Sequence, residues 1–469
     1  MSDLCFLSAV ELARRIRARE VSAVEVLQAH IAQIERVDPA VNAMVTRTFE
    51  RAEADARAVD AKLSRGESVG VLAGLPVAHK DLALTRGVRT TFGSPLFADF
   101  IPDQDTLLVE RLKAAGAVTV GKTNTPEFGA GSQTFNTVFG ATRNPWDLSR
   151  TCGGSSGGAA VALACGMVPL ADGSDLGGSL RNPASFCNVV GFRGSSGVVP
   201  AWPSQHAWYT LGIVGPMART VEDIALMLSA TAGPDPRVPI SVHRPGADFA
   251  PPLATDLKGK RIAWSRDLGG LPFEPAVLET LDRAVPVFED LGCTVEAATP
   301  DLRDADAIFR VLRAWFFDSQ HGDLIRKHRD RFKQTVIWNA EEGQRLSGAD
   351  IGRAERQRTE LFHRMRAFFE RYDYLVCPVV QVLPFDVNVE YPTEIAGQRL
   401  ETYLDWMKSC YLISATGLPA LSVPAGFSAS GLPVGLQIVG PHLADRGVLE
   451  LAWAFEQATR WFERRPPAV

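Results

Sequence analysis

Residues 153–181 read GGSSGGAAVALACGMVPLADGSDLGGSLR, two segments rich in glycine and serine that enclose a small apolar one. Residues 157–166 are typical of a buried helix of small residues, and residues 168–170 of a short strand. A flexible linker is the alternative for such a composition, but a linker would not enclose an apolar helix and strand. The two glycine-rich segments are therefore predicted to be ordered loops at the ends of buried elements.

The second of these loops has the groups that acyl transfer requires. Backbone N–H groups next to glycines can turn inward and bind an anion, and each donor aimed at developing negative charge is typically worth about 2.7–4 kcal/mol. The predicted oxyanion donors are the N–H groups of Leu176, Gly177, Gly178 and Ser179. The hydroxyl group of Ser179 lies beside them, so Ser179 is the candidate nucleophile, and a serine nucleophile needs a base.

The base is sought among lysines, because none of the later histidines sits in a distinctive turn. A lysine acts as a base only when neutral, and burial can lower its pKa from about 10.4 by several units. Lys80 follows the apolar strand pattern of residues 74–79, although it could equally be a surface lysine paired with Asp81. Adjacent strand residues point to opposite faces, so Asp81 need not neutralise it. Lys122 is the second candidate, and His79 is interpreted as a core or edge histidine.

Two other motifs compete for the chemistry. Residues 116–123, GAVTVGKT, match the phosphate-binding P-loop, but a β-branched run lies where the loop should be, and Pro126 resists the helix that should follow. Residues 154–158, GSSGG, match the nucleophile elbow with Ser156 at its centre, but that elbow requires a preceding apolar strand and residues 144–150 are a predicted loop. The sequence therefore favours neither a nucleotide-hydrolysing enzyme nor a serine–histidine triad.

The composition, with 46% hydrophobic and 22% charged residues among 469, is that of a soluble globular protein. A net charge of −5 and a pI near 6.0 give no electrostatic reason to expect a nucleic-acid partner. No apolar run approaches the roughly 20 residues that span a bilayer, and the N-terminus does not resemble a signal peptide. The seven scattered cysteines and eight scattered histidines lack metal-site spacing, so we expect a reduced cytoplasmic protein without a metal.

Strand and helix patterns alternate along the chain, which predicts a largely parallel or mixed sheet covered by helices. Residues 1–66 are predicted to be an N-terminal helical segment packed on this body, and residues 303–373 a mostly helical cover. Residues 275–291 are predicted to form one helix. Nothing in the composition requires a domain boundary, so a single α/β domain over residues 1–469 is predicted.

Taken together, these segments closely resemble the amidase signature family. The resemblance rests on residues 153–181 with Lys80 and Asp81 upstream, and it covers most of the chain. Further matching segments are residues 121–129, 215–220, 417–420 and 431–437. The resemblance implies the family fold, a large mixed β-sheet sandwiched between α-helices, in agreement with the alternation of strands and helices.

The resemblance also implies a role for each residue of the two loops. The lysine of the family's Lys-Asp element is the base, which falls on Lys80. The first serine of its double-serine turn, in a cis peptide, bridges base and nucleophile, and this position falls on Ser155. The acylated nucleophile falls on Ser179, and the oxyanion donors fall on residues 176–179. Positions that support the relay or brace the oxyanion loop fall on Ser156, Asp175 and Arg181.

The implied reaction is hydrolysis of a small-molecule amide through an acyl-enzyme, without a metal or organic cofactor. Members of this family act on aryl and aliphatic amides, oligoamides, esters and carbamates (urethanes), and the sequence leaves the choice among these open. The same resemblance places Phe128, Gly129, Gly131 and Ser132 beside the acyl group. Trp208, in the apolar segment 201–211, is a candidate pocket aromatic.

The main alternative is a subunit of the glutaminyl-tRNA amidotransferase type that acts in a complex, and a catalytically silent binding protein is a third hypothesis. Residues 194–198, GSSGV, lack the tyrosine and arginine found there in such subunits, which favours a stand-alone amidase. Cys152 also stands where proline or glycine is common in the family. We expect a monomer or homodimer that binds neither nucleic acid nor membrane.

Overall fold

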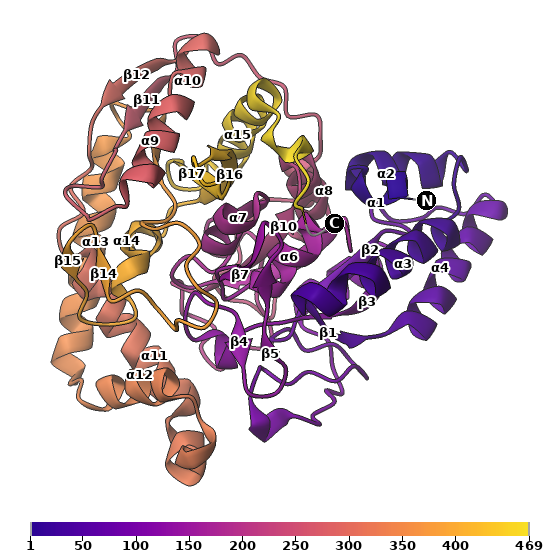
Figure 1. Ribbon diagram of the computed structural model, residues 1–469, viewed down its shortest axis with the longest axis horizontal. Helices are drawn as coiled ribbons and strands as arrows, with labels where there is room; N and C mark the ends of the chain where they lie inside the picture. Colours follow the sequence, from indigo (N-terminus) through magenta and orange to yellow (C-terminus); the bar gives the residue numbers. More distant parts are fainter. Residues whose placement is uncertain (1, 468–469) are drawn as a thin grey trace.

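A mixed β-sheet of eleven strands runs through the computed structural model, which describes residues 2–467 (Figure 1). Its strands are β1 (Met44–Arg47), β2 (Pro76–Lys80), β3 (Val118–Thr123), β8 (Leu170–Asp175), β9 (Val190–Arg193), β10 (Ile213–Ala218), β11 (Arg261–Trp264), β12 (Thr294–Ala297), β13 (Tyr374–Pro378), β16 (Ala420–Phe427) and β17 (Pro433–Val439). Their spatial order is β1-β3-β2-β8-β10-β9-β16-β17-β13-β11-β12. Neighbours between β8 and β13 are antiparallel, whereas β3-β2-β8 and β13-β11-β12 are parallel, which confirms the predicted mixed sheet.

Helices pack against this sheet throughout the chain, as the α/β pattern predicts. They are α1 (Ser2–Phe6), α2 (Ala9–Arg17), α3 (Ala23–Val41), α4 (Phe49–Ser64), α5 (Leu107–Ala114), α6 (Gly157–Ala164), α7 (Arg181–Cys187), α8 (Val221–Thr231), α9 (Pro275–Ala284), α10 (Val287–Asp290), α11 (Ala305–His328), α12 (Gln334–Gln344), α13 (Gly348–Phe368), α14 (Lys408–Thr416) and α15 (Asp445–Thr459). Three short two-stranded sheets join β4 (Phe135–Asn136) to β5 (Gly140–Ala141), β6 (Arg143–Asn144) to β7 (Asp147–Thr151), and β14 (Glu394–Ile395) to β15 (Gln398–Arg399).

The N-terminal segment differs from the predicted run of helices in one element. Residues 44–47 form β1, which pairs antiparallel with β3 at the edge of the sheet. Asn42, in the left-handed conformation at φ 55°, ends α3 and turns the chain into this strand. A strand of four residues is too short to show a clear alternation of apolar and polar residues in the sequence. Such a strand forms because it pairs with a segment that is distant in the chain. Met1 and residues 468–469, the predicted outer limits of the domain, lie outside the described residues.

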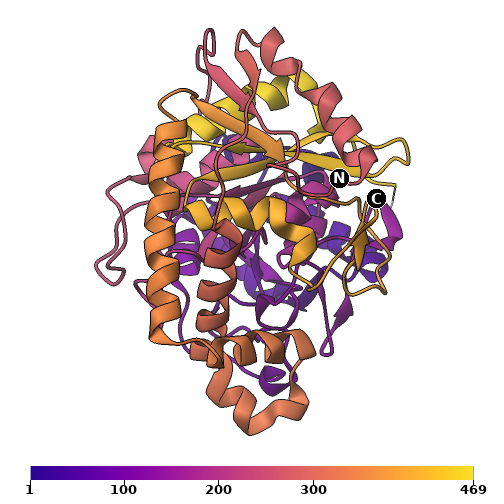
Figure 2. The ribbon, with the colours of Figure 1, turned by 90° about the vertical axis from the view of Figure 1, so that its left-hand side faces the viewer.

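The predicted cover at residues 303–373 consists mainly of α11, α12 and α13. Figures 1 and 2 show α12 and the end of α11 projecting from the body, and Figure 1 places them opposite α1–α4. A second apolar cluster, here called the cover cluster, forms from Ala130, Phe317, Ile325, Phe332, Val336, Ile337 and Ala340. Phe128 and Leu176 are partly buried against it, so the cover contacts the loops that follow β3 and β8.

Two other predicted elements shift at their ends. The single helix predicted over residues 275–291 divides into α9 and α10 at Pro286, whose missing N–H and ring interrupt a helix. The strand predicted at residues 168–170 begins only at Leu170 and continues to Asp175, so it carries the chain directly into the second glycine-rich loop. Among residues 2–467, no helix is long and apolar enough to cross a bilayer.

Candidate active site

Lys80 ends β2, and its side chain is buried with 1% exposure. Its Nζ lies 2.7 Å from Ser155 Oγ, 2.9 Å from Ser156 Oγ and 3.1 Å from Ser174 Oγ. A neutral amine has two N–H donors and one lone pair, so three hydroxyl partners satisfy it completely. The lone pair can accept the hydroxyl hydrogen of Ser155, which is the nearest partner. The sequence did not single out Ser174. Its hydroxyl group reaches Lys80 because β8 lies next to β2 in the sheet.

The surroundings of Lys80 lower the pKa of its amine to about 7. Burial is the main cause, and the negative charges of Asp175 and Asp172 oppose it by favouring the ammonium form. The alternative pairing with Asp81 is wrong, because that carboxylate accepts hydrogen bonds from the main-chain N–H and the hydroxyl of Thr91 instead. Lys80 is therefore a buried amine and not a surface lysine, and about half of the amine is neutral at pH 7.

Lys122, the second candidate base, lies on β3 opposite His79 of β2. Burial lowers the pKa of its amine to about 8. Its Nζ donates to the carbonyl oxygen of Ala83 and to Thr85 Oγ1, the latter at 2.9 Å. Both acceptors belong to the loop that follows Lys80. The structure therefore brings this amine to the loop after β2 and not to the serines of the two glycine-rich segments.

The turn that carries Ser155 and Ser156 precedes α6, and its Gly154–Ser155 peptide bond is cis, as the resemblance implies. The turn and the first residues of α6 are rich in glycine because other chain segments pack directly against them. A Cβ atom on Gly158 would lie 2.3 Å from the backbone nitrogen of Asn124, a separation that no side chain can tolerate. The close approach of β3 and its loop to α6 thus requires glycine at this position.

Ser179 lies between β8 and α7 with 9% exposure. The N–H of Ser156 donates to the carbonyl oxygen of Ser179 at 3.2 Å, which joins the two signature loops. The predicted set of four oxyanion donors differs from the structure at Gly178. The N–H of Gly178 donates to Asp175 Oδ1 at 2.8 Å and is therefore already bound. A buried carboxylate requires such donors. Among the described residues, the N–H groups that keep no protein acceptor in this loop are those of Leu176, Gly177 and Ser179.

The carboxylate of Asp175 holds the oxyanion loop in place through hydrogen bonds to the N–H groups of Gly178 and Leu180. Its carboxylate accepts hydrogen bonds from Arg181 Nε and Nη2, each at 3.0 Å, and Arg193 Nη1 lies 3.2 Å from Oδ1. Burial alone would raise the pKa of this carboxyl group, but the two guanidinium groups hold it well below its usual range. Arg193, which the sequence did not single out, also donates to the carbonyl oxygens of Asp175 at 2.6 Å and Leu211 at 2.7 Å. Two arginines therefore brace this loop.

Two of the expected substrate-binding residues lie next to the signature loops. Gly129 packs against the candidate bridge, since a Cβ atom there would lie 3.4 Å from Ser155 Oγ. Ser132 Oγ accepts a hydrogen bond from Asn182 Nδ2 at 3.0 Å. The main-chain N–H of Asn182 in turn donates to the carbonyl oxygen of Gly178 at 2.7 Å. Ser132 is thus connected to the oxyanion loop through a single residue.

The other expected substrate-binding residues contact the cover or are exposed to solvent. The ring of Phe128 stacks on that of Phe332 in the cover cluster, with centroids 5.6 Å apart. Gly131 lies beside the cover, because a Cβ atom there would be 3.8 Å from Lys333 Nζ. Trp208 is 77% exposed, so its ring does not lie in a buried pocket wall.

The competing motifs take other forms in the structure. Residues 118–123 of the P-loop match form the fully buried strand β3 and not a phosphate-binding loop. All seven cysteines are buried and free. Within residues 2–467, no group of three or more His, Cys, Asp or Glu side chains is arranged to hold a metal ion.

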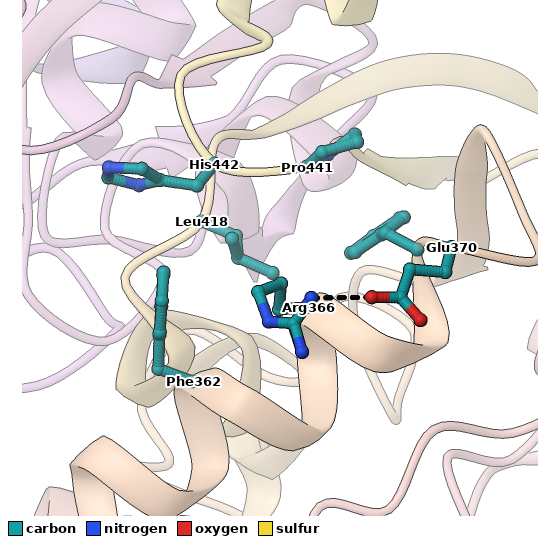
Figure 3. A pocket seen from close by; sticks show the side chains of 7 residues that line it. Phe362, Arg366, Glu370, Leu418, Pro441 and His442 are labelled. Atoms are coloured by element: carbon teal, nitrogen blue, oxygen red, sulfur yellow. Dashed lines mark hydrogen bonds and ion pairs between the residues drawn. The ribbon is translucent and has the colours of Figure 1, made fainter.

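A hollow of about 280 Å³ opens on another part of the surface, beside α13 (Figure 3). Its lining residues are Phe362, Arg366, Phe369, Glu370, Leu418, Pro441 and His442. Arg366 and Glu370 form an ion pair of 2.5 Å within it. None of the serines or lysines described above lines this hollow, so it is distinct from the candidate active site.

Comparisons with known proteins identify the family of the chain. The family model described as Amidase matches residues 25–449. An acylamidase from Rhodococcus erythropolis is 37% identical over 468 residues, covering 99% of this chain and 98% of that protein. A glutamyl-tRNA(Gln) amidotransferase subunit from Moorella thermoacetica is 39% identical over 496 residues, covering 99% of each.

A crystal structure of a bacterial aryl acylamidase of the amidase signature family superimposes with a TM-score of 0.91 at 30% identity. The superposition covers 97% of each chain, so the fold is shared over nearly the whole length. The chain belongs to the amidase signature family and is an amidase-type hydrolase that acts on carbon–nitrogen bonds other than peptide bonds.

Proposed function

We propose that the chain hydrolyses small-molecule amides through an acyl-enzyme on Ser179, with Ser155 as proton bridge and neutral Lys80 as base. The observation that carries the proposal is the Lys80 amine, which is buried among three serine hydroxyl groups and has a pKa of about 7. A general base is most effective when its pKa lies near the working pH.

The proposed reaction needs only groups of this chain and water. Ser179 Oγ attacks the carbonyl carbon while its proton passes to Ser155 Oγ, whose own proton passes to Lys80 Nζ. The N–H groups of Leu176, Gly177 and Ser179 stabilise the oxyanion of the tetrahedral intermediate. As the carbon–nitrogen bond breaks, the proton returns through Ser155 to the leaving nitrogen. Water then attacks the ester by the same route and releases the acid.

The cover cluster supports a substrate with an apolar group. Leu176 of the oxyanion loop packs against this cluster together with Phe128. The rings of His321 and Phe128 are in contact, with centroids 4.4 Å apart. Burial lowers the pKa of His321 to about 4, so its imidazole is neutral at pH 7. The members of the cover cluster are all uncharged. We propose an uncharged aryl or alkyl amide as the substrate class, with carbamates (urethanes) and esters as further substrates of the same carbonyl chemistry.

The amidotransferase subunit remains the second candidate because relatives with that name are as similar in sequence as the acylamidase. A stand-alone enzyme is favoured by residues 194–198, whose glycines and serines provide no charged group for a partner or for glutamine. Ser195 of this segment instead donates its N–H to Asp445 Oδ1 of α15 at 2.7 Å. The chain is proposed to act as a cytoplasmic monomer or homodimer.

A substrate panel on the purified chain tests the proposal. Anilides, primary amides including glutamine, alkyl and aryl carbamates and esters are compared, with Ser179→Ala as the matched inactive control. We expect turnover of uncharged anilides by the chain alone, at rates that Ser179→Ala does not approach. Hydrolysis of glutamine alone, or activity that arises only with an added partner, would instead support the amidotransferase subunit.

A further inference from the structure

A buried histidine–aspartate pair lies directly behind Lys80 and has no part in the reaction described above. His79 Nδ1 is 2.5 Å from Asp172 Oδ2, and His79 Nε2 is 3.0 Å from Thr119 Oγ1. His79 and Asp172 are each 1% exposed. Because a carboxylate oxygen only accepts, His79 Nδ1 carries the hydrogen of this bond.

The pair occupies the point at which two strands separate. The parallel ladder between β2 and β8 runs from Val77 to Ala78 and ends there. On the other side of β2, the ladder with β3 continues to Lys80. The main-chain N–H of Lys80 donates to Asp172 Oδ1 at 2.9 Å, so a side chain takes the place of the missing strand carbonyl.

The separation of the two strands makes room for the catalytic cluster. Ser174, two residues after Asp172 on β8, presents its hydroxyl to Lys80 Nζ at 3.1 Å. Each oxygen of the Asp172 carboxylate has one partner, the main chain of Lys80 for Oδ1 and the ring of His79 for Oδ2. His79 thereby fixes the carboxylate, and the carboxylate fixes the backbone from which the Lys80 side chain extends.

We propose that His79 and Asp172 are positioning residues, which hold the Lys80 main chain so that its amine points at Ser155. This inference rests on the proposed role of Lys80 as the base. It goes beyond that role because it assigns a function to two residues that touch neither the substrate nor the reacting atoms. A misplacement of about 1 Å at a catalytic group can cost about 10²-fold in rate.

The charge of Asp172 gives the pair a second effect. The charges that act on the Lys80 amine are those of Asp175 and Asp172 on β8, whereas Asp81 after β2 and Lys122 on β3 act on each other. The guanidinium groups of Arg181 and Arg193 lie on Asp175, whereas the carboxylate of Asp172 contacts the imidazole ring of His79. Asp172 favours the ammonium form of Lys80, so removal of its charge lowers the pKa of that amine.

Three variants separate the effects of shape and charge. Asp172→Asn keeps an acceptor for the Lys80 N–H, and its amide can donate to the other tautomer of His79. We expect the acid limb of kcat/KM to move to lower pH, because the charge of Asp172 favours the ammonium form of Lys80. Asp172→Leu removes the anchor, so kcat should fall by about 10²-fold with KM little changed. His79→Gln, which keeps an N–H donor, should retain much more activity than His79→Leu.

The matched control is Asp223→Asn, a buried carboxylate that accepts from the N–H of Val10 at 3.0 Å, away from the serines. It should leave the pH profile unchanged. An unshifted acid limb in Asp172→Asn, together with equal kcat values for His79→Gln and His79→Leu, overturns the inference. If Asp172→Asn does not fold, the two His79 variants decide by the same kcat comparison. Full activity of Lys80→Met would instead overturn the proposed function itself, so the two failures are distinguishable.

Discussion

The pH dependence of the reaction should follow the ionisation of Lys80. At pH 7 a lysine with its ordinary pKa of 10.5 is neutral in about one molecule in 3,000, whereas a pKa of about 7 leaves about half of the molecules neutral. Burial therefore increases the fraction of active base by about 10³-fold. We expect kcat/KM to rise with pH through a single proton loss centred near pH 7, and Lys80→Met to lose activity by orders of magnitude together with this limb.

The assay is anilide hydrolysis between about pH 5 and pH 10, with the labelling rate of a fluorophosphonate as a second reading of serine reactivity. Lys122→Met is the control, because Lys122 is also buried and its pKa is also lowered, to about 8. Its amine binds the loop after β2, so this variant should keep the limb near pH 7. A limb that disappears in Lys122→Met and persists in Lys80→Met, or a wild-type limb near pH 10, would refute the reasoning.

Three further predictions concern stability and substrate. Between pH 7 and 9 the unfolded chain binds the Lys80 proton that the folded chain has released, so wild-type stability should rise by about 2–3 kcal/mol relative to Lys80→Met in denaturant unfolding. Gly178→Ala places a Cβ atom 2.5 Å from that of Cys410 at a backbone φ of +113°. This variant should lower the free energy of unfolding by about 1–3 kcal/mol and slow fluorophosphonate labelling. The control Gly259→Ala, at φ +78° in open space, should not slow labelling. Phe332→Ala should raise KM for anilides more than for acetamide, and an equal effect on both would place the apolar group elsewhere.

The loop that ends at Ser179 was predicted from its own residues, whereas Ser155 and Lys80 were assigned through the resemblance to the family. Gly177 and Gly178 indicate a loop of backbone N–H donors. The alternation of side chains along a strand also predicts that Lys80 and Asp81 point to opposite faces, and Asp81 bonds to Thr91 instead. The sequence alone left Lys80 and a surface lysine equally open. Its burial comes from strands that are distant in sequence, and the structure was needed to show it.

Other features depend on contacts that no local pattern records. His79 lies next to Lys80 in sequence, yet its partner Asp172 comes from a different strand. The N–H of Gly178 was expected in the oxyanion hole, and only the position of Asp175 shows that it is already bound. The edge strand β1 likewise forms by pairing with β3, which is distant in sequence. Such features follow from tertiary packing, which a periodicity in the sequence does not reveal.

The most direct test of the account is to locate the covalent intermediate. The purified chain is treated with a fluorophosphonate, or with an activated ester at low pH, and the adduct is assigned by peptide mass spectrometry. The account predicts one adduct, on Ser179, which is lost in Ser179→Ala and retained in Ser156→Ala. An adduct on Ser156, or labelling that persists in Ser179→Ala, would contradict the assignment of Ser179 as the nucleophile.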